Sequence, residues 1–194
     1  MKLFMALLLA CVVLSSGCIE TEDIIMSKIA EETGLGFLCK YTKTEAGSNY
    51  CYENMALKTL DPDLCQRISG VEGRNDCVKE FVEKGGDGNL CGQIRQDDDE
   101  MNSCYMQTSY DRKQPNLCRP ITDWGQRNSC YYNLGYKLGD ETICRKIDKT
   151  YQTGGRRAYC FTAAAKKNND AKLCDEIMDE GLKDSCLKKV GGQT

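Results

Sequence analysis

The chain has 194 residues, a formal net charge of −3, fourteen cysteines and no histidine. A chain with this nearly neutral charge lacks the broad basic field with which proteins bind nucleic acid, so we expect no nucleic-acid partner. The absence of histidine removes the commonest general base, the commonest zinc ligand and any histidine-ligated haem.

The first 17 residues have the features of a signal peptide for export. Lys2 supplies a short positive region, and the apolar stretch from Leu3 to Leu14 has about 12 residues, fewer than a helix needs to span a bilayer. Residues 1–17 are therefore predicted to be a signal peptide. Retention of this segment as a single-span anchor is an alternative.

The predicted signal peptide leads into the segment Ser15-Ser16-Gly17-Cys18. This segment resembles the lipobox of prokaryotic lipoproteins, in which the cysteine is lipidated and becomes the first residue of the mature chain. It departs from the usual pattern because Ser15 stands where a leucine is usual. The resemblance implies that Cys18 carries a lipid anchor. An ordinary signal peptide cut near the same place is the alternative.

Residues 18–34 contain this cysteine and then either a tether or a short helix. Thr21 can cap a helix, Ile25 and Ile29 are one helical turn apart, and Gly34 can end it. The spacing favours the helix.

The other cysteines define a repeat of roughly 26 residues over residues 35–194. Cys11 lies in the signal peptide and Cys18 carries the lipid, which leaves twelve cysteines, an even number in an exported chain. Counted along the chain from Cys39, the odd-numbered cysteines of this set are called first-type and the even-numbered ones second-type. The step from each second-type cysteine to the next first-type cysteine is always 14 residues. We expect six units, which are 35–60, 61–86, 87–113, 114–139, 140–169 and 170–194.

Each unit is predicted to be a pair of short helices, as the unit 61–86 illustrates. Asp61 is a suitable N-cap, and Leu64 and Ile68 lie one turn apart on a first helix of about seven residues. A polar loop at 69–73 follows, where we expect length changes between units to fall. The second helix contains Cys77 and stops at Gly85-Gly86.

Helices this short are marginal in water, so a covalent link between the two would stabilise the pair. An antiparallel hairpin places the two cysteines of one unit opposite each other. The predicted disulfides are Cys39–Cys51, Cys65–Cys77, Cys91–Cys104, Cys118–Cys130, Cys144–Cys160 and Cys174–Cys186. The rival pairing joins Cys51 to Cys65 and so on, and leaves Cys39 and Cys186 unpaired. The predicted fold is all-α, with tandem disulfide-linked helical hairpins that stack into a short α-solenoid.

Two sequence patterns recur in the units. The pattern D-x-x-L-C-x-x-I runs from Asp61 to Ile68 and from Asp87 to Ile94, and an R-N-x-C-Y pattern runs from Arg127 to Tyr131. In these patterns the chain resembles uncharacterised prokaryotic, largely archaeal, exported proteins with cysteine-bearing helical repeats. The resemblance covers about residues 35–190. It implies the fold and export, and it implies no activity.

A residue that departs from the usual type at its repeat position is a better functional candidate than one present in every unit. The positions two and six residues after the second cysteine lie on one face of the second helix. In units three and four they hold Met106, Tyr110, Tyr132 and Tyr136 instead of polar residues. We predict that these four, with Trp124 as a further candidate, form a binding patch. The alternative is that this face packs against a neighbouring helix, and that Trp124 plugs a loop.

The sequence contains no recognisable catalytic residues, and we expect no metal and no cofactor. The run Asp97-Asp98-Asp99-Glu100 lacks the alternating ligands and glycine of a calcium loop, so a solvated loop is expected. The predicted function is a non-enzymatic binding or scaffold module, lipid-anchored on the extracytoplasmic face of the cell membrane, with a protein or peptide partner. A thiol-redox or metal-thiolate protein that uses its cysteines chemically is the alternative.

Overall fold

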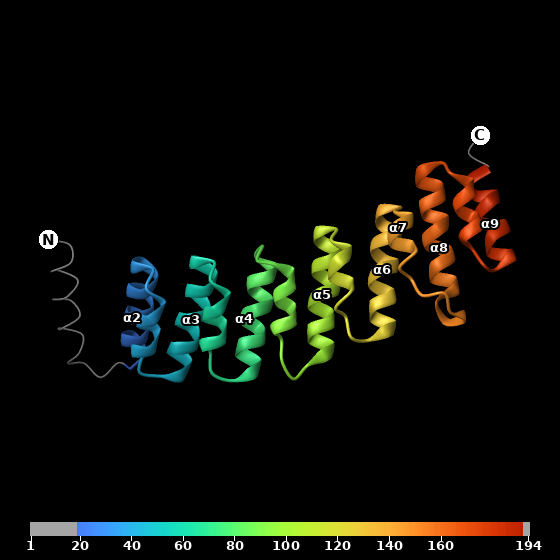
Figure 1. Cartoon of the computed structure of the whole chain (residues 1–194). Helices are drawn as coiled ribbons and strands as arrows, with labels where there is room; N and C mark the ends of the chain where they lie inside the picture. The colour runs from blue at the N-terminus through green and yellow to red at the C-terminus, as the bar shows by residue number, and fades with distance from the viewer. Residues whose placement is uncertain (1–18, 192–194) are drawn as a thin grey trace. The chain divides into compact units, whose positions relative to one another are not determined.

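The computed structural model describes residues 19–191, and every regular element in that range is a helix (Figure 1). The predicted signal peptide and Cys18 lie outside the described residues. The chain divides into two compact units, Met1–Gln96 and Asp97–Thr194. The all-α class and the disulfide-linked helical repeats are confirmed.

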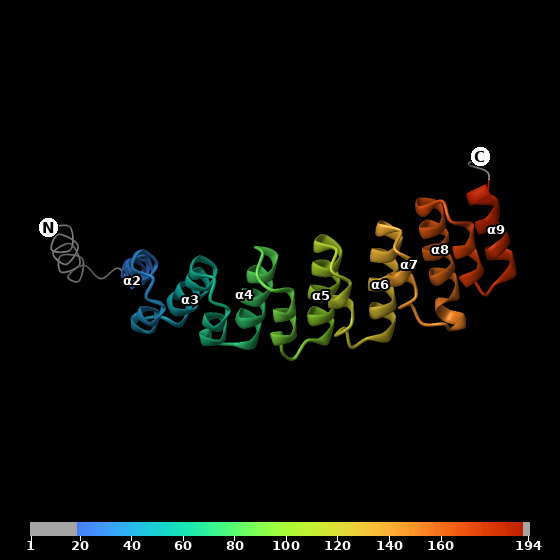
Figure 2. The same cartoon turned by 45° about the horizontal axis from the view of Figure 1, so that its top comes forward.

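The first unit alternates long α-helices with short 3-10 helices. Its described elements are α2 (Ile19–Thr33), η1 (Gly36–Tyr41), α3 (Glu45–Thr59), η2 (Pro62–Arg67), α4 (Val71–Glu83) and η3 (Gly88–Gln93). The long helices α2, α3 and α4 run side by side in chain order (Figure 2).

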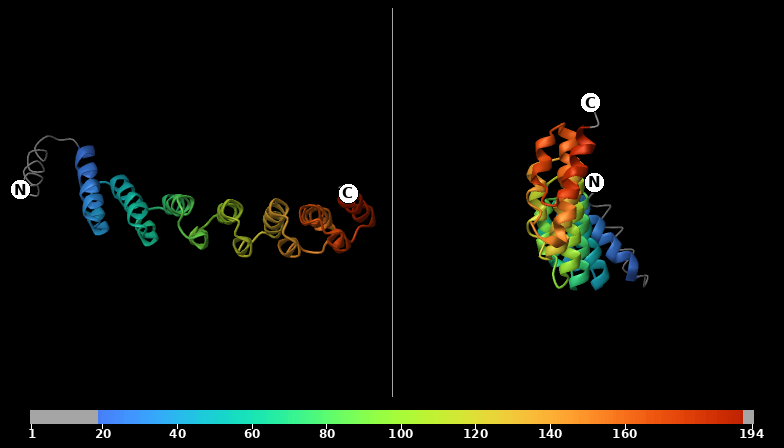
Figure 3. Two further views of the ribbon diagram at one scale, coloured as in Figure 1. Left: turned by 90° about the horizontal axis from the view of Figure 1, so that it is seen from above. Right: turned by 90° about the vertical axis from the view of Figure 1, so that its right-hand side faces the viewer.

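The second unit continues the same alternation. Its described elements are α5 (Asp98–Arg112), η4 (Pro115–Cys118), α6 (Trp124–Leu138), α7 (Glu141–Cys144), α8 (Tyr151–Asn168), η5 (Ala171–Glu176) and α9 (Glu180–Gly191). Seen from above, its long helices form one layer and its short helices a second layer (Figure 3). Helix α5 packs against η4, α6 packs against both η4 and α7, and α8 packs against both α7 and η5.

The short helices begin at the predicted aspartate caps. The side chains of Asp61, Asp87, Asp140 and Asp170 each accept a hydrogen bond from the backbone N–H two residues later. Most of these helices are of the tighter 3-10 type and have four to six residues, as η4 and η2 show, which is shorter than predicted. A 3-10 helix rises farther per residue, so fewer residues cover the same length.

The long helices begin earlier than the sequence suggested. Helix α4 starts at Val71, inside the segment expected to be a loop, because Gly70 takes a positive φ of 78° and reverses the chain within one residue. Helices α3, α4, α5 and α6 all start six residues before their cysteine. Helix α8 starts nine residues before Cys160. The extra residues of the fifth unit thus mainly lengthen a helix, which corrects the prediction that insertions fall in the loop.

A residue with a left-handed backbone conformation follows most of the long helices and ends them. Leu60, Lys113 and Gly139 have φ values of 57°, 58° and 63°, and each donates its backbone N–H to a carbonyl four residues earlier. These residues are the last ones of three predicted units.

An asparagine on each of four long helices binds the next repeat. It lies two residues before the second cysteine, and its Oδ1 accepts the backbone N–H of the residue twenty positions later. The pairs are Asn49 with Ser69 (2.8 Å), Asn75 with Arg95 (3.0 Å), Asn102 with Thr122 (2.9 Å) and Asn128 with Asp148 (2.9 Å). We call this contact the asparagine clamp.

Helix α2 forms the same kind of contact with an aspartate. The two carboxylate oxygens of Asp23 accept the backbone N–H groups of Lys43 and Thr44 and the Thr44 hydroxyl. Asp23 is 20 residues before Lys43, which is the clamp spacing. Residues 19–33 are therefore a helix rather than a tether, and this helix acts as the second half of an incomplete repeat.

Disulfides join the short and long halves of five repeats. The structure contains Cys39–Cys51, Cys65–Cys77, Cys118–Cys130, Cys144–Cys160 and Cys174–Cys186, with Cα–Cα distances of 5.4 to 5.8 Å. These are five of the six predicted pairs. Cys91 and Cys104 are also disulfide-bonded, as the sixth predicted pair requires. The sulfurs lie in the core with isoleucine, leucine and alanine side chains around them.

Candidate binding groove

The four main residues of the predicted patch line one groove between α5 and α6. Met106 and Tyr110 come from α5, and Tyr132 and Tyr136 come from α6. The cavity they enclose has a volume of about 650 Å³, and Ser103, Gln107, Asn133 and Lys137 complete its rim. We call it the α5–α6 groove.

The helical period explains how these side chains come to the same groove. On α5 the residues Asn102, Tyr105 and Ser109 are buried, and Met106 and Tyr110, four and eight residues after Asn102, lie at the edge of this buried face. Helix α6 repeats this arrangement, because Cys130, Tyr131 and Leu134 are buried there. Adjacent repeats in one register therefore place their equivalent positions next to each other.

The groove is open rather than filled by a neighbouring helix. Tyr110 is 39% exposed and Tyr136 is 54% exposed, while Met106 and Tyr132 are half-buried. The alternative was that this face packs against a neighbouring helix. It applies only in part, because Met106 and Tyr132 are half-buried.

Aromatic contacts order the groove. The rings of Tyr132 and Tyr136 lie 5.8 Å apart at an angle of 44°. The ammonium group of Lys137 lies 3.5 Å from the ring centre of Tyr110 and 3.5 Å from its carbonyl oxygen. Such a cation–π contact fixes both side chains without removing the aromatic surface from solvent. The groove therefore presents an ordered tyrosine wall with one positive charge at its edge.

Trp124 does not line this groove, which corrects its inclusion in the patch. It is the first residue of α6 and is half-buried, and its carbonyl accepts a hydrogen bond from Asn128 at 3.0 Å. Tyr132 follows two helical turns later, about 12 Å along the helix axis.

The acidic run at 97–100 starts a helix instead of forming a loop. Asp97 caps α5 by accepting the N–H of Glu100 at 2.8 Å, and the next three residues are the first turn of α5. Carboxylates are favourable at this end of a helix because of its dipole. Within residues 19–191 no group of three or more histidine, cysteine, aspartate or glutamate side chains is placed to hold a metal ion.

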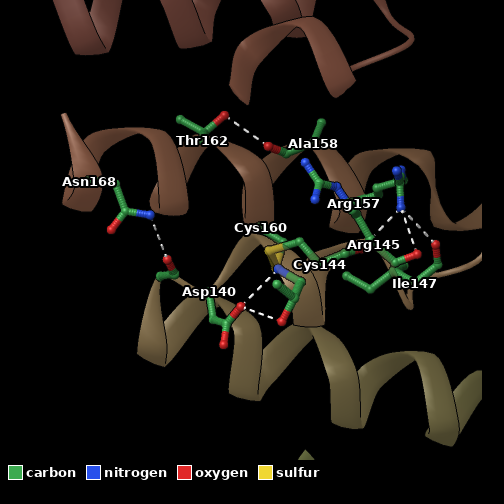
Figure 4. The surroundings of a disulfide bond; sticks show 11 residues. Asp140, Cys144, Arg145, Ile147, Arg157, Ala158, Cys160, Thr162 and Asn168 are labelled. Carbon is green, nitrogen blue, oxygen red and sulfur yellow. Dashed lines mark hydrogen bonds between the residues drawn. A yellow bond between two sulfur atoms is a disulfide. The ribbon is translucent and has the colours of Figure 1, made fainter. Parts of the chain in front are cut away.

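An arginine before the second cysteine closes the short helix of its own repeat. Arg74 donates to the carbonyl of Ile68 at 3.0 Å, and Arg127 donates to that of Ile121 at 2.9 Å. The side chain of Arg157 is buried, and one of its terminal nitrogens donates to three carbonyls at the end of α7 (Figure 4). Burial lowers the pKa of Arg157, although the nearby Glu176 carboxylate opposes this effect.

Sequence analysis did not find the asparagine clamp. Its signal was present, since four of the six units carry asparagine two residues before the second cysteine. The contact itself joins residues twenty apart, so only the fold shows which backbone group the amide binds.

No family model, no curated protein and no solved structure matches the chain. Over residues 19–191 the helices are all too short or too polar to cross a bilayer. The function is therefore argued from the groove itself.

Proposed function

We propose that this protein is a non-enzymatic binding or scaffold module that holds a protein or peptide segment in the α5–α6 groove. The observation that carries the proposal is that Met106, Tyr110, Tyr132 and Tyr136 line one open cavity on two adjacent helices. Tyrosine and methionine are enriched at protein interfaces, where they offer large contact areas at low entropic cost.

The occupant expected from this lining is an apolar or aromatic side chain on a protein segment. The half-buried Met106 and Tyr132 offer an apolar floor, and the exposed hydroxyl-bearing rings of Tyr110 and Tyr136 offer both apolar surface and hydrogen bonds.

We further propose that the protein is exported and anchored by lipid at Cys18 on the extracytoplasmic face of the cell membrane. The support is the signal-like sequence of residues 1–17 together with the disulfides, which persist in oxidising compartments. A metal-thiolate role would need free thiolates, and the twelve cysteines from Cys39 to Cys186 are disulfide-bonded. The binding role is therefore favoured.

The test compares capture of membrane proteins by three forms of the chain after chemical crosslinking. The forms are the unaltered chain, the Tyr132→Ala, Tyr136→Ala double variant, and a Tyr50→Ala control. Tyr50 is 57% exposed on α3 and does not line the groove. We expect a partner that the unaltered chain and the control capture and that the double variant loses. Equal capture by all three forms would remove the groove from the proposal.

A further inference from the structure

A second cavity lies between α8 and the start of α9, and it occurs where the repeat pattern is broken. Its volume is about 470 Å³. Gly154, Gly155 and Ala158 line it from α8, and Glu176, Met178 and Leu182 line it from the following segment. We call it the α8–α9 cavity. It is separate from the α5–α6 groove, and the inference below does not depend on the proposed function.

The cavity exists because the asparagine clamp is missing at this junction. Ala158 lies two residues before Cys160, which is the clamp position, and Met178 is the residue twenty positions later. At four other junctions the corresponding N–H is bound by an asparagine oxygen at 2.8 to 3.0 Å. Alanine has no such oxygen, and the backbone N–H of Met178 has no acceptor among residues 19–191.

The wall of the cavity on α8 is recessed as well. A Cβ atom placed on Gly154 or on Gly155 would meet no atom within 4 Å. The additional residues of α8 are 151–153; Gly154 occupies the position at which α3, α4, α5, α6 and α9 begin, and Gly155 follows it. The fifth repeat therefore differs from its neighbours by a lost amide, about one added helical turn and a glycine at position 154, where the fourth and sixth repeats have Trp124 and Glu180.

A buried nitrogen with an unused proton also belongs to this cavity. Arg157 is 3% exposed, and its terminal nitrogens donate to three carbonyls and to Glu176. Its Nε is buried and has no hydrogen-bond partner in the described part of the chain, residues 19–191. A buried N–H without an acceptor costs free energy that an oxygen entering the cavity would recover.

We propose that the α8–α9 cavity binds a primary carboxamide, namely the side chain of an asparagine or glutamine on a protein partner. The oxygen of this amide would accept the N–H of Met178 as the internal asparagines accept theirs. The apolar surfaces of Ile177 and Leu182, which also line the cavity, would contact the methylene groups of the same side chain.

An amide fits this cavity better than a carboxylate does. Two cationic side chains, Lys149 and Arg157, and two carboxylates, Glu176 and Asp179, line the cavity, and Arg157 pairs with Glu176 at 3.3 Å, so the charge of the lining is balanced and a neutral polar group leaves it balanced. An amide also donates. Asn75 shows this use, because its Nδ2 donates to the carbonyl of Arg95 at 3.0 Å while its Oδ1 accepts the N–H of the same residue.

The binding test uses propionamide as a neutral probe and propionate as its anionic counterpart. Each is titrated into the full chain with its disulfides intact, and backbone amide resonances are followed by NMR. We expect propionamide to give saturable shifts at Met178, Ile177 and Ala158, and propionate to give none. The Tyr132→Ala, Tyr136→Ala variant should keep these shifts. Absence of saturable shifts with propionamide, or equal saturation by propionate, would overturn the proposal.

The variants Ala158→Asn and Ala158→Leu give a second, independent readout. The asparagine variant should fill the cavity, abolish the propionamide shifts and slow hydrogen exchange at the Met178 amide about fivefold, the factor that one net hydrogen bond of about 1 kcal/mol gives. Leucine has nearly the same shape and no amide, so the leucine variant should leave this exchange rate unchanged. Equal slowing in the leucine variant would show that exclusion of water, rather than an amide contact, governs the site, and would overturn the proposal.

Discussion

Replacement of Asn75 by alanine tests whether the asparagine clamp holds neighbouring repeats together. Asn75 is 4% exposed, and it makes two hydrogen bonds of 3.0 Å with the backbone of Arg95. Each such bond contributes about 1 kcal/mol net, and alanine regains roughly 0.5 kcal/mol through its higher helix propensity. We therefore expect the free energy of unfolding to fall by about 1.5 kcal/mol.

Urea denaturation with the disulfides intact measures this loss, and thermal melting should show a Tm lower by about 3–6 °C. The matched control is Asn133→Ala, an exposed asparagine within α6 for which we expect no loss. For Asn75→Asp we expect a loss in the free energy of unfolding between those of Asn75→Ala and Asn133→Ala. A carboxylate can accept the backbone N–H, as Asp23 does, but it cannot donate to the carbonyl. If Asn75→Ala and Asn133→Ala behave alike, the clamp does not stabilise the repeats.

Further predictions concern other contacts of the same fold. The hydrogen bond from the Thr44 hydroxyl, opposed by burial and aided by backbone N–H groups, lowers the pKa of Asp23. The stabilisation that the Asp23 carboxylate contributes is therefore complete above the pKa of an aspartate in the unfolded chain, about 3.9, and is lost as pH falls through the lower pKa of the folded chain. The Tm difference between the unaltered chain and Asp23→Asn should accordingly shrink below about pH 4. Gly135→Ala should lower Tm, because the new Cβ would lie 2.6 Å from the Cys160 sulfur, and melting curves check this. Reduction of the disulfides should remove much of the helicity seen by circular dichroism, since each closes a loop worth about 2–4 kcal/mol, and unchanged helicity would refute their structural role. Cys18→Ala should release the protein from membranes, and a fractionation that finds it still membrane-bound would contradict lipidation at this cysteine.

The parts of the fold that depend on local sequence could be predicted. The cap at Asp61 and the helix end at Gly34 use residues whose preferences act within a few positions. The antiparallel hairpin expected within each unit likewise predicted the cysteine partners, because the rival pairing leaves Cys39 and Cys186 unpaired. The start of α4 was missed because the glycines at 70 and 73 made the segment around Val71 look like a loop when no packing partner was known.

The candidate groove could be predicted because equivalent positions on the long helices of two adjacent units lie next to each other. The helical period alone therefore brought Tyr110 and Tyr136 to the same groove. Trp124 was placed wrongly because its position along the axis of α6 depends on where that helix begins. The clamp depends on contacts between units, which no local pattern encodes.

Departures from the repeat have a physical reason to coincide with function in this fold. A stack of repeats is stabilised mainly by contacts between neighbours, so one junction can lose a clamp without unfolding the others. The junction at Ala158 has lost its clamp, and the ion pairs from Arg145 and Arg157 to Glu176, each at 3.3 Å, bridge the same two repeats instead. These charged contacts lie beside the cavity and leave the Met178 N–H without an acceptor among residues 19–191. An asparagine at position 158 would satisfy that N–H at once, and its absence is most simply explained if a partner supplies the amide.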